Sequence, residues 1–122
     1  MLTRIVTIAF CALTLPMVAG PAMAGKLFGA IAFSPASGKV GGGWNYATKK
    51  EATDRAVSQC GAEDCDTVVV FPNCGAVAVG DGYGMGYSAD KSVAKSEETA
   101  IANCTGYTGN CLITMSFCNE GS

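Results

Sequence analysis

The chain has 122 residues, with 8 Lys and Arg against 10 Asp and Glu and a formal net charge of −2. It carries no run of basic residues that would neutralise a phosphate backbone, so nucleic acid is not an expected partner. The chain also contains no histidine. This excludes Ser-His and Cys-His nucleophile pairs and removes the commonest zinc ligand.

Residues 1–24 have the pattern of a secretory signal peptide. Arg4 supplies positive charge, residues 5–15 are apolar, and residues 22–24 form a small-x-small cleavage site. The apolar stretch is too short to span a hydrocarbon core, which needs about 20 apolar residues. We therefore expect an exported mature protein, residues 25–122, without a transmembrane segment. Its expected location is the periplasm or the outside of the cell.

The first half of the mature chain contains three expected strands. A strand of small residues at 29–33 is followed by a turn cluster at 34–38, and a second strand runs through Trp44 and Tyr46. A continuous apolar, β-branched run at 67–71 predicts a third strand, covered on both faces.

A helix is expected between the second and third of these strands. It begins near Lys49, because Thr48 and Glu51 have the spacing of a capping box, and Gly61 ends it in a left-handed conformation. Glu51 and Arg55 are spaced as an i,i+4 ion pair. The expected apolar face consists of Ala52, Ala56, Val57 and Cys60.

The second half repeats this order of elements with different surface residues. A small strand at 75–79, a turn at 80–82 and an alternating strand containing Tyr83, Met85 and Tyr87 lead into a second helix. Ser92 or Asp90 caps that helix, and a strand at 112–117 ends the domain. The expected apolar face of this helix consists of Val93, Ala100, Ile101 and Cys104.

The two halves align as an internal duplication. Ala56 and Cys60 match Ala100 and Cys104 with no gap within the helix. Two copies are too few for a solenoid, so the sequence predicts one compact α+β domain. Its expected architecture is a duplicated β-β-α-β unit with pseudo-twofold symmetry, the repeats covering about residues 27–72 and 73–118.

Six of the seven cysteines remain once the signal peptide, which contains Cys11, is removed. An even number in a small exported chain is typical of a disulfide framework. Six cysteines allow fifteen pairings, but helix-end cysteines at equivalent places in the two copies favour one of them. The expected pairs are Cys60 with Cys65, Cys104 with Cys111, and Cys74 with Cys118. Zinc and thiol redox sites are the alternatives, and neither zinc-knuckle spacing nor a C-x-x-C motif supports them.

The strand openings Gly29-Ala30-Ile31-Ala32-Phe33-Ser34 and Cys74-Gly75-Ala76-Val77-Ala78-Val79 carry a resemblance to a known family. Together with Trp44-Asn45-Tyr46 and the segment from Cys60-Gly61 to Asp64-Cys65, they are similar to the secreted bacterial domain-of-unknown-function family 4189. The resemblance covers residues 27–118. It implies a bacterial, exported protein, and it transfers no catalytic residue because the family has no general biochemical function assigned. Some members of that family lack the pair matching Cys104 and Cys111.

No constellation in the sequence predicts a catalytic, cofactor or metal site. The carboxylates of Glu51, Asp54, Glu97 and Glu98 fall on expected solvent faces of the helices, which leaves a carboxylate-dependent hydrolase as a minor alternative. The glycines of residues 82–87 fit a nucleotide loop only loosely, because no immediate helix in a dinucleotide fold follows them. The oxygen ligands around Asp64, Asp66 and Asp81 lack the spacing of a calcium loop.

The aromatic residues Trp44, Tyr46, Tyr83 and Tyr87 are the candidate ligand contacts, because they lie on Gly-flanked strands that the pseudo-symmetry could bring to one sheet face. The alternative is that they fill a core with few large aliphatic residues. The sequence therefore predicts a non-catalytic, disulfide-stabilised binding module, not an enzyme, whose unknown partner is a protein or a cell-envelope glycan. A periplasmic inhibitor or immunity-type protein is the second hypothesis.

Overall fold

The computed structural model describes residues 25–121. The expected signal peptide and Cys11 lie outside the described residues. Within residues 25–121, no helix is both long and apolar enough to cross a membrane.

The structure consists of two β-β-α-β units with the same strand order. In each unit the first strand is central and pairs antiparallel with the other two, giving three-stranded sheets of order β2-β1-β3 and β5-β4-β6. The first unit contains β1 (Phe28–Phe33), β2 (Val40–Tyr46), α1 (Lys49–Cys60) and β3 (Asp66–Phe71). The second contains β4 (Cys74–Val79), the short 3-10 helix η1 (Asp81–Tyr83), β5 (Met85–Asp90), α2 (Val93–Thr105) and β6 (Leu112–Cys118).

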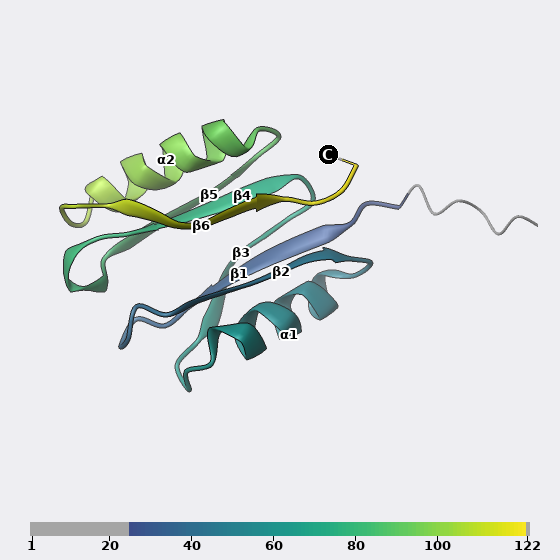
Figure 1. The fold of residues 1–122 in the computed structure, drawn as a ribbon, viewed down its shortest axis with the longest axis horizontal. Helices are drawn as coiled ribbons and strands as arrows, with labels where there is room; N and C mark the ends of the chain where they lie inside the picture. The colour runs from purple at the N-terminus through teal and green to yellow at the C-terminus, as the bar shows by residue number, and fades with distance from the viewer. Residues whose placement is uncertain (1–24, 122) are drawn as a thin grey trace, which may run out of the picture.

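The two units stack sheet against sheet, with one helix on each outer face. Figure 1 shows the resulting four layers: α2, the β5-β4-β6 sheet, the β2-β1-β3 sheet and α1. Strand β1 lies across from β4, β2 from β6, and β3 from β5. The duplicated α+β architecture predicted from the sequence is therefore confirmed.

The alternation of side chains along the central strands explains the layers. Ala30 and Ala32 of β1 face α1, where they pack against Ala52 and Ala56, while Ile31 between them faces the other sheet. In the middle of the central strand, small residues thus face the helix and a larger residue faces the other sheet. The second unit follows the same rule, with Ala76 and Ala78 against α2 and Val77 between the sheets.

Glycine allows each helix to approach its sheet closely. A Cβ atom at Gly41 would lie 2.2 Å from the carbonyl oxygen of Ala56, and one at Gly86 would lie 2.4 Å from that of Ala100. Both distances are far shorter than a van der Waals contact. Gly41 and Gly86 occupy equivalent places, opposite Ala32 and Ala78 respectively, so both units use the same close helix-sheet contact.

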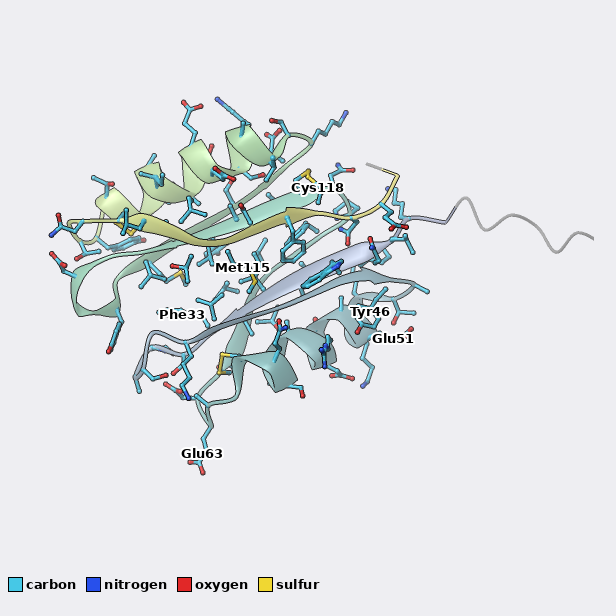
Figure 2. The ribbon with its side chains drawn as sticks, viewed as in Figure 1. Phe33, Tyr46, Glu51, Glu63, Met115 and Cys118 are labelled. Carbon is cyan, nitrogen blue, oxygen red and sulfur yellow. A yellow bond between two sulfur atoms is a disulfide. The ribbon has the colours of Figure 1, made fainter. Side chains whose placement is uncertain are left out.

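The inner faces of the sheets form the main core. The rings of Trp44 and Phe117 have centroids 5.3 Å apart and those of Phe71 and Phe117 5.1 Å apart, so three aromatic rings join the sheets at one end. Figure 2 shows Met115 pointing from β6 into the space between the sheets. This core contains Ile31, Phe71 and Val77, with Val40, Val68, Val69, Val79, Met85, Met115 and Phe117 packed around them.

The helix boundaries follow the expected capping residues. The Thr48 hydroxyl accepts a hydrogen bond from the Glu51 N–H, and Gly61 ends α1 with a φ of 72°. Ser92, not Asp90, caps α2. The Glu51 carboxylate accepts a hydrogen bond from the Thr48 hydroxyl, and the ion pair on this helix joins Lys50 and Asp54 in place of the expected Glu51 and Arg55.

Three other local expectations were wrong. Val93 and Ile101 are exposed, because the narrow face of α2 that touches the sheet consists of Ser96, Ala100 and Cys104. Residues 67–71 are mostly half-buried, because β3 is an edge strand. Tyr83 lies in η1 with a φ of 63°, so the strand begins only at Met85.

The structure contains three disulfides, with the expected pairs. Cys60–Cys65 and Cys104–Cys111 join the end of each helix to the loop before the last strand of its unit. Cys74–Cys118 joins neighbouring positions on β4 and β6, so it ties the start of the second unit to the C-terminal strand. None of the three bridges crosses from one unit to the other.

A hydrogen-bonded clamp at Asn119 joins the units instead. Its side-chain oxygen accepts from the Asn45 N–H at 2.9 Å, and its amide donates to the carbonyl oxygens of Phe71 and Asn73. The Asn45 side-chain oxygen in turn accepts a hydrogen bond from the Glu120 N–H at 2.7 Å. Asn119 is buried and directly follows Cys118, so the disulfide fixes the clamp in position.

Candidate functional site

Trp44 and Tyr46 point to opposite faces of their sheet. The pairing register shifts between Phe28 and Ala30, so two residues of β2 stand opposite one of β1, and Asn45 in this bulge has a φ of 64°. Trp44 therefore contacts Phe117 in the inner core, while Tyr46 packs on the cluster beneath α1. Figure 2 shows Tyr46 near the start of that helix.

Both side chains nevertheless border one small hollow at the outer edge of β2. This β2-edge depression has a volume of about 200 Å³ and is lined by Gly42, Gly43, Trp44, Tyr46 and Arg55. Trp44 is half-exposed, but its ring is also part of the inner core. Replacing Trp44 would therefore disturb packing as well as any ligand.

Tyr83 and Tyr87 do not join Trp44 on one face. Tyr83 covers the turn before β2, where a Cβ at Gly38 would lie 2.5 Å from its ring. Tyr87 lies on β5, which faces β3, whereas the β2 strand of Trp44 faces β6. The β2 edge and the β5 edge therefore lie on opposite sides of the stacked sheets. Trp44 and Tyr46 lie at the β2 edge, Tyr83 at the turn before β2 and Tyr87 on β5, so the four aromatic residues form no common surface.

Tyr87 lines a larger hollow together with a residue that the sequence analysis did not identify. This β5-edge groove has a volume of about 540 Å³, and Tyr107, which also lines it, is 83% exposed. The one sequence signal for Tyr107 is the longer loop between helix and last strand, with cysteines seven residues apart in the second unit and five in the first. The groove is lined by Met85, Gly86, Tyr87, Ala102, Asn103, Gly106 and Tyr107.

The loop that carries Tyr107 is held at several points. The Cys104–Cys111 disulfide closes it. The Thr108 hydroxyl donates to the carbonyl oxygen of Asp81 at 2.8 Å, and the Asn110 amide donates to the Asp81 carboxylate at 2.8 Å. The Asp81 N–H in turn donates to the carbonyl oxygen of Gly109 at 3.0 Å. Tyr107 is thus exposed on a loop whose conformation is fixed by the rest of the unit.

Asn103 lines the groove and contacts the strand edge. Its side-chain amide donates to the carbonyl oxygen of Tyr87 at 3.0 Å, which shows that this carbonyl points away from β4. The equivalent contact in the first unit is reversed, since the Gly42 N–H donates to the side-chain oxygen of Gln59 at 2.7 Å. In both units, one helix side chain covers the middle of an open sheet edge.

The carboxylates considered for hydrolysis do not form one site. Glu51 and Asp54 lie on α1, and Glu97 and Glu98 lie on α2, at opposite outer layers of the fold. Glu97 accepts a hydrogen bond from the Ser116 hydroxyl at 2.8 Å. Among residues 25–121, no three His, Cys, Asp or Glu side chains gather as a metal site.

Asp64 is a carboxylate whose pKa is lowered by its hydrogen bonds. The Ser34 hydroxyl donates to Asp64 at 2.5 Å and the Ala36 N–H donates to its other oxygen at 2.9 Å. These two bonds hold the pKa of Asp64 below its ordinary value. They tie the turn between β1 and β2 to the loop after α1, so the group has a structural role.

A further hollow, of about 710 Å³, is formed by the two ends of the described chain, around residues 25–27 and 120–121.

Comparison with known proteins gives the family and the fold. Two curated mycobacterial relatives, Protein Mb1300c of Mycobacterium bovis and Protein Rv1269c of Mycobacterium tuberculosis, are each 43% identical over 60 residues, 49% of this chain and 48% of theirs. The match therefore spans about half the length of these relatives. The NMR structure of Rv1813c from Mycobacterium tuberculosis shares the fold, with a TM-score of 0.59 and 24% identity over 98% of each chain. The model of the family described as "Domain of unknown function (DUF4189)" matches residues 28–118, and the chain belongs to that family.

Proposed function

We propose that this chain is an exported, non-catalytic binding module that holds a protein or cell-envelope glycan through exposed aromatic side chains. The observation that carries the proposal is Tyr107, a large ring that is 83% exposed on a loop fixed by a disulfide and by hydrogen bonds to Asp81. An aromatic ring held in this way contacts a ligand with little loss of conformational freedom.

Export is supported by two independent features. The first residues have the pattern of a signal peptide, and three disulfides are typical of proteins in an oxidising compartment such as the periplasm or the extracellular space. A net charge of −2 argues against a nucleic-acid ligand.

The test is affinity capture from envelope extracts with the oxidised mature protein, the reduced protein serving as the folding control. Tyr107→Ser should reduce capture of the specific ligand at least about fivefold, because it removes an exposed contact ring. The matched control is Leu112→Ser, since Leu112 is 73% exposed, lies close in sequence and lines none of the hollows described above.

The eluted protein and carbohydrate are analysed separately. Equal capture by the unmodified protein and the Tyr107→Ser variant, with equal melting temperatures, would contradict the assignment of this ring to ligand binding. Turnover of an envelope glycan by the purified protein would contradict the non-catalytic part of the proposal.

A further inference from the structure

We infer that the Cys74–Cys118 disulfide is a redox switch for the contact between the two units. A dithiol reductant opens this bridge at Cys118 while the protein stays folded, and the opening loosens the Asn119 clamp. The other two disulfides stay closed under the same conditions. The inference concerns the C-terminal end of β6 and does not depend on the ligand of the binding module.

The cysteines of residues 25–121 differ in their access to solvent. Cys118 is exposed near the C-terminal end of β6 (Figure 2), whereas its partner Cys74 is only 2% exposed. Both cysteines of the Cys60–Cys65 bridge are buried, and in the Cys104–Cys111 bridge one is fully buried and the other half-buried. An external thiolate has to reach a sulfur atom of the bridge, so exposed disulfides are the ones reduced most readily. Cys118 is therefore the point of attack.

The local structure keeps the two sulfur atoms close after the bridge opens. Cys74 and Cys118 are direct partners in the β4–β6 ladder, and the Asn119 N–H donates to the carbonyl oxygen of Asn73 at 2.8 Å. The Cys74 sulfur lies 3.5 Å from the carbonyl oxygen of Lys91, which can accept a hydrogen bond from the thiol of the reduced protein. Because the strands remain paired, the bridge can form again without refolding.

The chemistry is a thiol–disulfide exchange in two steps, with a dithiol as the two-electron reductant. A thiolate of the dithiol attacks the Cys118 sulfur and forms a mixed disulfide, while the Cys74 sulfur leaves as a thiolate. The second thiolate of the reductant then attacks its own sulfur in the mixed disulfide, and the Cys118 thiolate leaves. The protein gains two thiols, whose protons come from the dithiol, and the dithiol is oxidised to a disulfide.

Opening the bridge acts on the contact between the units because the clamp directly follows Cys118. The Asn119 side chain accepts a bond from the Asn45 N–H, and the Asn45 side chain accepts one from the Glu120 N–H. Residues 119 and 120 thus hold the β2 bulge of the first unit. In the oxidised protein, the bridge ties this strand end covalently to β4. Once that tie is gone, the hydrogen bonds at the strand end open more often.

The first test is graded reduction of the oxidised mature protein, followed by rapid alkylation and peptide mass spectrometry. In dithiothreitol without denaturant, Cys74 and Cys118 should become alkylated at least about tenfold faster than either other pair. With reduced glutathione, the mixed disulfide should form on Cys118. Reduction of all three bridges at one rate, earlier reduction of another bridge, or glutathione attached to Cys74 would overturn the inference.

The second test is hydrogen exchange of the oxidised and the selectively reduced protein. After reduction, the Asn45 and Glu120 amides should exchange at least about tenfold faster, because their clamp bonds open more often. The Asp81 amide is the internal control, since it donates to the carbonyl oxygen of Gly109 in the loop closed by the other disulfide of this unit. Unchanged exchange at Asn45 and Glu120 would overturn the switch.

A pair of variants shows whether the bridge acts through the clamp. Asn119→Ala removes the clamp and keeps the bridge, so reduction should accelerate exchange of the Asn45 amide less than about twofold in this variant. Glu120→Ala is the matched control, because it retains the backbone N–H and should show the full acceleration. A full response of the Asn45 amide in Asn119→Ala would overturn the assignment of the switch to the clamp.

Discussion

Asp64 shows how one carboxylate can connect two loops of the first unit. It accepts bonds from the Ser34 hydroxyl and from the Ala36 N–H, and Ser34 in turn accepts a bond from the Ser37 hydroxyl at 2.7 Å. Ser34 is fully buried, so these bonds give its hydroxyl a partner inside the fold. The adjacent Cys65 is held by its disulfide, which fixes the backbone next to the carboxylate.

Asp64→Asn should therefore destabilise the protein at neutral pH. The pKa of Asp64 lies below its ordinary value of 3.8 in the folded state, first because of the Ser34 bond and then because of the Ala36 bond. A depressed pKa stabilises the fold above the ordinary value, and this contribution is lost as the pH falls below about 3.8 through the folded value. The difference in unfolding free energy between the two proteins should thus shrink below that pH.

Denaturant unfolding measured from neutral pH down to pH 2 checks this prediction. Glu63→Gln is the control, because Figure 2 shows Glu63 pointing away from the molecule. A difference in stability that stays constant over the whole pH range would show that the charge of Asp64 does not matter.

At the scale of the elements, the contact between each helix and its sheet depends on glycine and alanine. Gly86→Ala should destabilise the second unit by at least about 2 kcal/mol, because a Cβ there would lie 2.1 Å from the backbone nitrogen of Cys104. The helix backbone has to move for the methyl group to fit. Gly109→Ala is the control, since its Cβ would meet only the Asp81 carboxylate, at 3.8 Å. Equal thermal unfolding midpoints for the two variants would contradict the close packing.

Features that depend on neighbouring residues, such as the ends of helices, could be predicted from the sequence. Features that depend on packing between distant residues, such as the buried face of a helix, could not. Thr48, Ser92 and Gly61 marked the ends of helices correctly because capping depends on neighbouring residues. Periodicity alone misplaced Val93 and Ile101, because only a narrow face of α2, containing Ser96, Ala100 and Cys104, touches the sheet.

The candidate site was only partly predictable for the same reason. Tyr87 was expected on a strand, as a candidate ligand contact or as part of the core, and it lies exposed on β5. The bulge at Asn45 that separates Trp44 from Tyr46 has no reliable sequence signal. Tyr107 sits in an irregular loop, and its position beside β5 depends on the bonds to Asp81. Neither periodicity nor the internal repeat contains that information.

At the scale of the whole molecule, the two units, as described over residues 25–121, are joined by no covalent bond other than the chain itself. Each disulfide lies within one unit, and the short connection between β3 and β4 is the backbone link. The inner core and the Asn119 clamp therefore supply the contacts between the sheets. The Cys74–Cys118 bridge contributes to this interface indirectly, because it places the C-terminal strand end from which Asn119 reaches the first unit.

Asn119→Ala should consequently loosen the whole molecule while all three disulfides stay intact. The substitution leaves the buried carbonyl oxygen of Phe71 and the Asn45 N–H without their side-chain partner, which should cost about 2–4 kcal/mol of unfolding free energy. Glu120→Ala is the matched control, because Glu120 joins the clamp through its backbone N–H, which the variant retains.

Denaturant unfolding of the oxidised proteins gives the free energies, and native-state hydrogen exchange locates the effect. Exchange should accelerate at the backbone amides of both sheets in Asn119→Ala, because opening the interface exposes the inner faces of the two units together. If Asn119→Ala and Glu120→Ala unfold at the same denaturant concentration, the inner core alone holds the units together. In that case the clamp would serve only to position the C-terminal residues.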